Sequence, residues 1–127
     1  MRVLGIDYGT RKIGLALATS KIAEPLRVVR VKSDEEALEK MEIVIDEEQI
    51  KSIVVGVSEK ETGKKSIQFG QRLKERTGLK VDFQDEALTT QDANKLSLEA
   101  GIGRKKRKEL EDAYSATLIL QSYLDNH

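Results

Sequence analysis

RVLGIDYGTRKIGLALAT, residues 2–19, contains two short apolar runs on either side of a glycine turn. The first run ends at Asp7 and has the length of a short strand, and in the second, Lys12 to Thr19, larger and smaller apolar residues alternate. The runs are joined only by residues 8–11, where Gly9 can adopt the positive φ that a tight turn often needs. This segment therefore predicts an antiparallel hairpin.

Beyond this hairpin, the apolar pattern changes between strand and helix periods. The continuous apolar run Ile53–Val57 indicates a strand covered on both sides, which is typical of a central, parallel position. Ser33 followed by Glu36 forms a capping box for the first helix, and Gly78 is placed to end the second. The expected strands are 2–7, 12–19, 26–31, 53–57 and 79–83, and the expected helices are 34–48, 62–77, 90–100 and 106–124. The order βββαβαβαα predicts an α/β fold with a mixed five-stranded sheet and helices on both faces.

The composition excludes several kinds of site. The chain of 127 residues has no cysteine, and its only histidine is the last residue, His127. Disulfides, thiolate metal sites and an imidazole base are therefore excluded, so chemistry must rely on carboxylates, hydroxyls, lysines and arginines. The length suits a single domain over residues 1–127. No apolar run approaches the roughly 20 residues of a membrane span, so we expect a cytoplasmic protein without membrane association.

A formal net charge of zero hides a segregation of charge along the chain. Residues 1–33 contain seven basic and two acidic residues, residues 60–80 contain the same numbers, and residues 104–108 are all basic. Residues 34–48 contain eight acidic residues and one basic residue, on a helix whose acidic face we expect to be solvated. Three basic blocks can form one basic face for a polyanion, but a solvated mosaic of charges explains the blocks alone equally well.

Three acidic positions are candidates for a shared site. Asp7 ends the first strand, Glu86 follows the fifth strand, and Asp112 lies at the start of the apolar part of the last helix. Because the carboxyl ends of parallel strands share one edge of a sheet, and the last helix can pack across them, we expect these acids to converge. Alone, Asp7 could be a turn cap and Glu86 a helix N-terminal acid. Asp112 could instead form an ion pair with Arg104 or Lys108.

Carboxylates without histidine or cysteine form an oxygen-only ligand set, which suits Mg²⁺ or Mn²⁺. Such a site can hold two ions roughly 4 Å apart, one to activate water and one to stabilise the leaving oxygen of a phosphodiester. Basic residues beside the acids would then contact phosphates. The candidates for nucleic-acid contact are Arg11, Lys12, Lys64, Lys65, Arg104, Lys105, Lys106, Arg107 and Lys108.

Three motifs in series resemble one protein family. They are GIDYGTRKIGLA at residues 5–16, DEALTT at 85–90, and the basic run 104–108 followed by Asp112 and ATLILQ at 116–121. In this order and at this length they closely resemble the YqgF/RuvX-like family of bacterial Holliday junction resolvases and ribosomal RNA precursor nucleases. The resemblance covers nearly the whole chain and implies an RNase H-like fold. It also implies that Asp7, Glu86 and Asp112 are the catalytic, metal-binding acids.

Two features depart from the family pattern. The family usually has an arginine where this chain has Ala87, so a phosphate or carboxylate contact is missing or comes from another residue. After the fourth strand the family tends to show a proline and an asparagine before a glycine, whereas residues 56–63 keep only the glycines. That loop lies near the expected substrate path, so the difference concerns substrate preference more than the acids.

The resemblance favours a metal-dependent endonuclease that acts on structured nucleic acid and matures the 5′ end of pre-16S ribosomal RNA. A Holliday junction resolvase is the alternative within the same chemistry, and it should dimerise because a four-way junction requires two symmetric cuts. We expect a monomer or a weak homodimer. Two other classes are a nucleotide-binding ATPase fragment, against which the short chain argues, and a non-catalytic RNA-binding or ribosome-assembly module.

Overall fold

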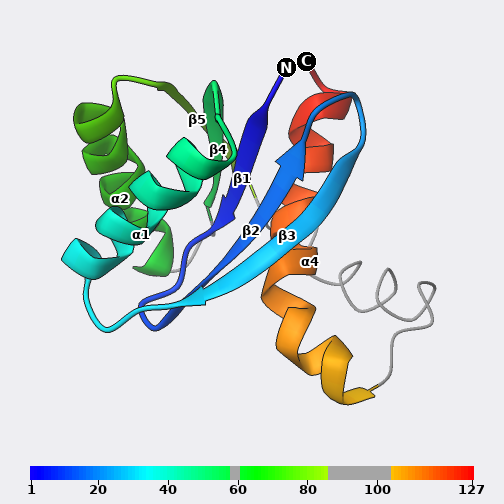
Figure 1. Ribbon diagram of the computed structural model, residues 1–127, viewed down its shortest axis with the longest axis horizontal. Helices are drawn as coiled ribbons and strands as arrows, with labels where there is room; N and C mark the ends of the chain where they lie inside the picture. The colour runs from blue at the N-terminus through cyan, green and yellow to red at the C-terminus, as the bar shows by residue number, and fades with distance from the viewer. Residues whose placement is uncertain (58–60, 86–103) are drawn as a thin grey trace.

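A five-stranded sheet forms the centre of the molecule, with helices on both of its faces (Figure 1). The computed structural model describes residues 1–57, 61–85 and 104–127, with side chains described from 63 and from 113 in the last two segments. The strands are β1 (Val3–Asp7), β2 (Lys12–Ala18), β3 (Ala23–Arg30), β4 (Ser52–Val57) and β5 (Lys80–Asp85), and the helices are α1 (Asp34–Glu47), α2 (Glu61–Thr77) and α4 (Arg104–Asp125). The helix expected at 90–100 lies outside the described residues. None of the described helices is both long and apolar enough to span a membrane.

The strands are arranged in the order β3-β2-β1-β4-β5, with β1 at the centre. β1 and β2 pair antiparallel, from Val3 opposite Ala18 to Asp7 opposite Gly14, which confirms the predicted hairpin. β4 pairs in parallel with both β1 and β5, as its continuous apolar run predicted. The carboxyl ends of β1, β4 and β5 therefore lie along one edge of the sheet.

Two strands are longer than expected. β3 begins at Ala23 rather than Leu26, because its pairing with β2 continues past a bulge as far as Ala18. An edge strand with a bulge tolerates Pro25, which has no backbone N–H to donate. β5 ends two residues later than expected, at Asp85, because its parallel pairing with β4 continues to that residue.

α1 and α2 cover one face of the sheet, and α4 covers the other (Figure 1). The larger core lies under α1 and α2 and includes Leu4 and Ile6 of β1. The smaller core lies under α4, where Val3 packs with Ile119 and Leu120. Successive residues of β1 therefore face opposite layers, as strand geometry requires. Among the described side chains of α4, the buried ones are Ala113, Tyr114, Ala116, Thr117, Ile119 and Leu120, as the apolar sequence of this helix predicted.

α4 lies close to β1 because Gly5 has no side chain. A Cβ atom placed on Gly5 would lie 2.8 Å from the Cβ of Leu120 and 3.1 Å from the carbonyl oxygen of Ala116. Neither atom can move without moving α4, since both are part of the helix framework. Gly5 therefore sets the distance between the helix and the central strand.

The turn between β1 and β2 needs glycine for a different reason from the one expected. Gly9 does not have a positive φ, so that prediction was wrong; among the described residues only Gln49 and Gly78 have one. A Cβ atom on Gly9 would instead overlap the carbonyl oxygen of Lys12. The turn is so tight that backbone atoms occupy the space of a side chain.

The predicted ends of the first two helices are confirmed. The Ser33 hydroxyl accepts a hydrogen bond of 3.1 Å from the backbone N–H of Glu36, which caps α1. The Glu36 carboxylate accepts at 3.2 Å from the backbone N–H of Lys32 rather than from that of Ser33. α2 ends at Thr77, and Gly78 follows with a φ of 72°.

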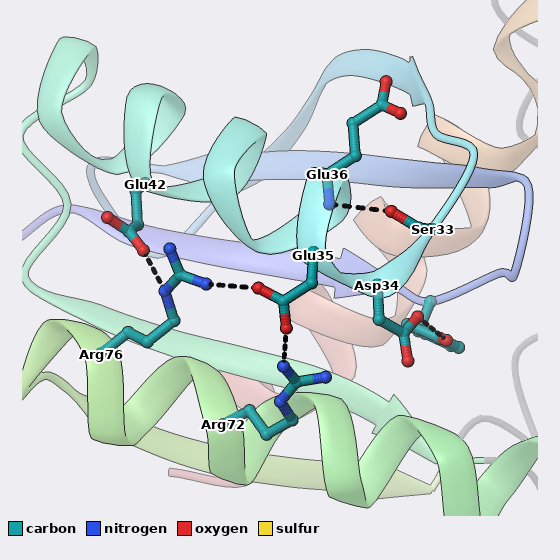
Figure 2. Close-up of polar contacts among 8 residues, drawn as sticks. Ser33, Asp34, Glu35, Glu36, Glu42, Arg72 and Arg76 are labelled. Carbon is teal, nitrogen blue, oxygen red and sulfur yellow. Dashed lines mark hydrogen bonds and ion pairs between the residues drawn. The ribbon is translucent and has the colours of Figure 1, made fainter.

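Ion pairs connect α1 to α2 at the surface (Figure 2). Arg72 and Arg76 of α2 both pair with Glu35, and Arg76 also pairs with Glu42 of α1. These side chains are about one-third to two-thirds exposed, so each pair contributes less than about 1 kcal/mol. Part of the acidic face of α1, which we expected to be solvated, is thus used to contact the next helix.

A hydrogen bond between α4 and β5 makes the stability of the fold depend on pH. The Tyr123 hydroxyl donates to the Asp82 carboxylate. This bond, assisted by Lys80 at 3.3 Å, lowers the pKa of Asp82, and it raises the pKa of Tyr123 to about 12. Asp82 contributes to the free energy of unfolding above pH 3.8, its pKa in the unfolded chain. This contribution is lost as the pH falls through the lowered pKa of the folded state. Tyr123 contributes to the free energy of unfolding below pH 10, its ordinary pKa, and this contribution is lost as the pH rises through about 12.

Tyr123→Phe is expected to lower the free energy of unfolding by at most about 1 kcal/mol at neutral pH, because the bond is partly exposed to water. The difference from wild type should shrink below the ordinary Asp82 pKa of 3.8, because protonation removes the charged acceptor. Urea unfolding at neutral pH and at about pH 3 measures this difference. In an Asp82→Asn background the substitution should have no pH-dependent effect. An equal difference between Tyr123→Phe and wild type at both pH values would contradict this account.

Candidate functional site

An open pocket lies at the carboxyl end of β1. It has a volume of about 300 Å³ and is lined by consecutive residues from Asp7 to Lys12, so the β1–β2 turn forms it. The two neighbouring parallel strands end along the same edge, β4 at Val57 and β5 at Asp85. This is the edge at which α/β sheets commonly carry ligand sites.

Asp7 faces the side of the sheet that α4 covers. Val3 packs under α4 and Gly5 lies against Leu120, so strand alternation places Asp7 on the same side. The Asp7 side chain is partly exposed. The first predicted acid therefore lies at the end of the central strand, on the same face as Val3 and Gly5.

Tyr8, the residue after Asp7, is held in place by contacts with α1 and α2. Its hydroxyl donates a hydrogen bond of 2.6 Å to Asp34 at the start of α1, and its ring contacts Phe69 of α2 with centroids 4.8 Å apart. Burial, followed by the hydrogen bond to Asp34, raises the pKa of Tyr8 well above its ordinary value, so the hydroxyl stays protonated. This contact could not be predicted from the local sequence pattern, which does not identify a partner 26 positions away.

The other two predicted acids are only partly covered by the structure. Glu86 lies outside the described residues, and β5 ends immediately before it at Asp85, whose side chain is exposed. Residue 112 lies within α4, one helical turn before Ala116, and its side chain is outside the description. Within the described residues, no group of three Asp, Glu, His or Cys side chains could hold a metal ion. Convergence of the three acids therefore stays a prediction.

The predicted basic residues are distributed over both faces of the sheet. Arg11 and Lys12 are exposed and line the pocket with Asp7. Lys64 and Lys65 are exposed near the start of α2, a helix on the face opposite to the one that Asp7 faces. Residues 104–108 form the first turns of α4, and their side chains are outside the described part. The structure adds Arg30, which pairs in register with Lys12 and which sequence analysis did not identify.

Comparison with known proteins shows similarity over nearly the whole chain. The model of the RuvX family, described as Holliday junction resolvase, matches residues 1–126. Proteins from Agathobacter rectalis, Dictyoglomus thermophilum and Lactococcus lactis subsp. lactis are 38%, 37% and 34% identical to this chain. Their alignments cover 98%, 99% and 99% of this chain and 95%, 96% and 95% of the relatives, which are all provisionally named pre-16S rRNA nuclease.

Solved structures with low sequence identity share the fold. RuvC from T. thermophilus in complex with a Holliday junction substrate has a TM-score of 0.66 at 17% identity, covering 99% of this chain and 94% of that one. The Fowlpox virus resolvase in complex with Holliday junction DNA has a TM-score of 0.65 at 14% identity, covering 99% and 98%. These similarities confirm the expected α/β architecture as the RNase H-like fold of RuvC-like resolvases. With a family match over residues 1–126 and relatives of this identity, the chain belongs to the RuvX family.

Proposed function

We propose that the protein is a metal-dependent endonuclease that acts on structured nucleic acid and processes the 5′ end of pre-16S ribosomal RNA. The observation that carries this proposal is the family match over residues 1–126, together with relatives at 34% to 38% identity provisionally named pre-16S rRNA nuclease. The proposal treats residues 1–127 as one nuclease domain that acts in the cytoplasm as a monomer or weak homodimer.

We assign catalysis to Asp7, Glu86 and Asp112. α4 runs antiparallel to β1, since its last residues line a pocket with Met1 and Val3 at the start of the strand (Figure 1). Gly5 lies against Ala116 and Leu120. Two residues along β1 and one turn along α4 each advance by about 6 Å, so this packing supports a position for residue 112 across from Asp7. β5 ends at the same edge of the sheet, at Asp85, and Glu86 is the next residue in the sequence.

Mg²⁺ or Mn²⁺ fits the proposed donors, because carboxylate oxygens are hard ligands and the chain has no cysteine and only a C-terminal histidine. Asp7, Glu86 and Asp112 would hold the metal. When bound, a pair of such ions supplies an activated water and stabilises the leaving oxygen of a phosphodiester. The contribution of the chain is to hold the carboxylates at the edge of the sheet and to bind the phosphates around the cleaved bond.

We assign phosphate binding to the basic residues around this edge. Arg11 and Lys12 line the pocket that contains Asp7, and the run 104–108 precedes residue 112 on the same helix. Lys64 and Lys65 would contact more distant parts of a large substrate, since α2 lies on the other face of the sheet. Positive charges beside an acidic centre allow the polyanion to approach it.

A Holliday junction resolvase is the second candidate. The description of the matching family and the junction complexes of two proteins with the same fold favour it. The chemistry would be identical, but a four-way junction requires two symmetric cuts and therefore a dimer. The two functions differ in substrate and in oligomeric state.

Cleavage of labelled pre-16S rRNA and of a synthetic four-way DNA junction by the purified chain tests the proposal. We expect products with Mg²⁺ or Mn²⁺ and none in EDTA. Ca²⁺ should allow substrate binding with little cleavage, because it takes about six to eight ligands in a looser geometry than the octahedral one of Mg²⁺. Gel analysis with each metal measures both outcomes. Cleavage of the RNA alone supports the rRNA nuclease, and cleavage of the junction alone supports the resolvase.

The Asp112→Asn variant is the control for a contaminating nuclease. It should bind either substrate but give no metal-dependent product. Cleavage that persists in EDTA, or that is equal for variant and wild type, would contradict the two-metal assignment. Binding without any metal-dependent product in wild type would instead identify a non-catalytic RNA-binding or ribosome-assembly module.

A further inference from the structure

The open end of the β2–β3 hairpin has two cations directly opposite each other. Lys12 at the start of β2 is in register with Arg30 at the end of β3. Like charges at opposite positions of an antiparallel pair destabilise the sheet. A phosphate bound above this pair would be attracted by both positive charges.

Lys12 and Arg30 face the same side of the sheet as Asp7. Asp7 is opposite Gly14, and Gly14 is opposite Val28, so these residues form one row across three strands. Lys12 and Arg30 form another row on the same face, two residues nearer the edge of the sheet at which β1 ends. With strands about 4.8 Å apart and a rise of about 3.4 Å per residue, the backbone of Arg30 lies about 12 Å from that of Asp7.

The charge of Arg30 is not balanced by an acid in the described part of the chain. Its side chain is exposed, and none of the described carboxylates forms an ion pair with it. Its backbone carbonyl accepts a hydrogen bond of 2.7 Å from Lys40 Nζ. The neighbouring Lys40, by contrast, has an acidic partner, because its Nζ lies 2.8 Å from Glu36. Glu36 also accepts a hydrogen bond from the backbone N–H of Lys32. Arg30 therefore presents its guanidinium to solvent.

Arg27 on the same strand is a natural comparison. It is opposite Leu15, which belongs to the core under α1 and α2, so it faces the other side of the sheet. Arg27 has an acidic partner there, because its guanidinium lies 3.6 Å from Glu48. The two arginines of β3 thus lie on opposite faces of the sheet, and only Arg27 has an acidic partner among the described residues.

We propose that Arg30, together with Lys12, binds the phosphate backbone of the nucleic acid on the face of the sheet that Asp7 shares, about 12 Å from Asp7. This proposal rests on the proposed function and extends it to a path: the substrate strand passes the open end of the β2–β3 hairpin, where Lys12 and Arg30 are exposed. The planar guanidinium can bind two phosphate oxygens at once, which fixes the strand as well as attracting it.

Arg30→Ser and its matched control Arg27→Ser test this path. The probe is a fluorescent RNA hairpin with a single-stranded extension, titrated with the full chain in Ca²⁺ and in KCl between about 50 and 200 mM. We expect Arg30→Ser to weaken binding about tenfold at the lowest salt and to reduce the slope of log Kd against log salt by about 0.7 to 0.9. Arg27→Ser should retain the wild-type affinity and slope. Arg30→Lys, which keeps the charge, should retain the slope.

Three results would overturn the proposal. If wild type binds the RNA hairpin and Arg30→Ser has the wild-type slope, Arg30 makes no phosphate contact, and the proposed function is unaffected. An equal loss of slope for Arg27→Ser shows a general effect of net charge instead of a path. If wild type binds neither the hairpin nor a four-way junction, the proposed function fails and this proposal fails with it.

Discussion

Asp7→Asn is expected to reduce metal-dependent cleavage by about a thousandfold or more while the fold remains intact. Asparagine keeps the shape of the side chain but lacks the negative charge that holds a divalent cation. Asp7 is the only acid among the residues that line the described pocket, so no other carboxylate of that turn can replace it. Single-turnover cleavage of the labelled substrate in Mg²⁺ measures the loss.

The stability of the same variant distinguishes a catalytic acid from a structural one. Without metal, we expect Asp7→Asn to melt about 2 to 5 °C above wild type, because the proposed site brings three carboxylates together and removing one of them would relieve their repulsion. Asp46→Asn is the matched control, since Asp46 lies on α1 in a pocket away from the Asp7 turn. It should change neither cleavage nor melting. A variant at Asp7 that melts well below wild type in EDTA would identify this acid as a turn cap.

Gly5→Val is expected to lower the free energy of unfolding by about 3 kcal/mol. The new Cβ would lie 2.8 Å from the Cβ of Leu120 and 3.1 Å from the carbonyl oxygen of Ala116, so α4 must move away from β1. Because α4 also contains residue 112, cleavage should fall together with stability. Urea unfolding measures the first effect, and a melting temperature lower by about 10 °C is the corresponding change on heating.

Gly78→Ala is the control for this steric effect. Within the described part of the chain, no atom beyond its own neighbours lies within 4 Å of the position of its Cβ, and its φ of 72° is what disfavours alanine. We expect a loss of about 1 kcal/mol from backbone strain, with no loss of cleavage. If Gly5→Val were as stable as Gly78→Ala, the close packing of α4 on β1 would be wrong.

Most of the secondary structure could be predicted because its signals are local. A continuous apolar run identified β4 as a parallel strand, Ser33 identified the start of α1, and Gly78 identified the end of α2. Each of these features depends on residues within about one turn or one strand of one another. Boundaries were less accurate where pairing with a neighbour extended a strand, as at Ala23 and Asp85.

The candidate site could be predicted only in part. Asp7 was identifiable because an acid ends the strand next to a glycine turn, and the structure places it in the pocket at the carboxyl end of β1. Glu86 and Asp112 were selected by topology and by resemblance to a family, and their assignment still depends on those arguments. Acids separated by many residues in sequence approach one another only through tertiary packing, which no local pattern encodes.

The order of elements, the hairpin and the acid at its turn follow from the amino-acid sequence alone, because periodicity, capping residues and turn residues act over short distances. Tertiary structure alone decided three other features: the bond from Tyr8 to Asp34, the steric requirement for Gly9, and the position of Arg30 opposite Lys12. Each of them depends on how separate segments meet. The register of β3 in particular is set by a bulge and by pairing along the whole hairpin, since its partly exposed residues have no strong apolar alternation to specify a face.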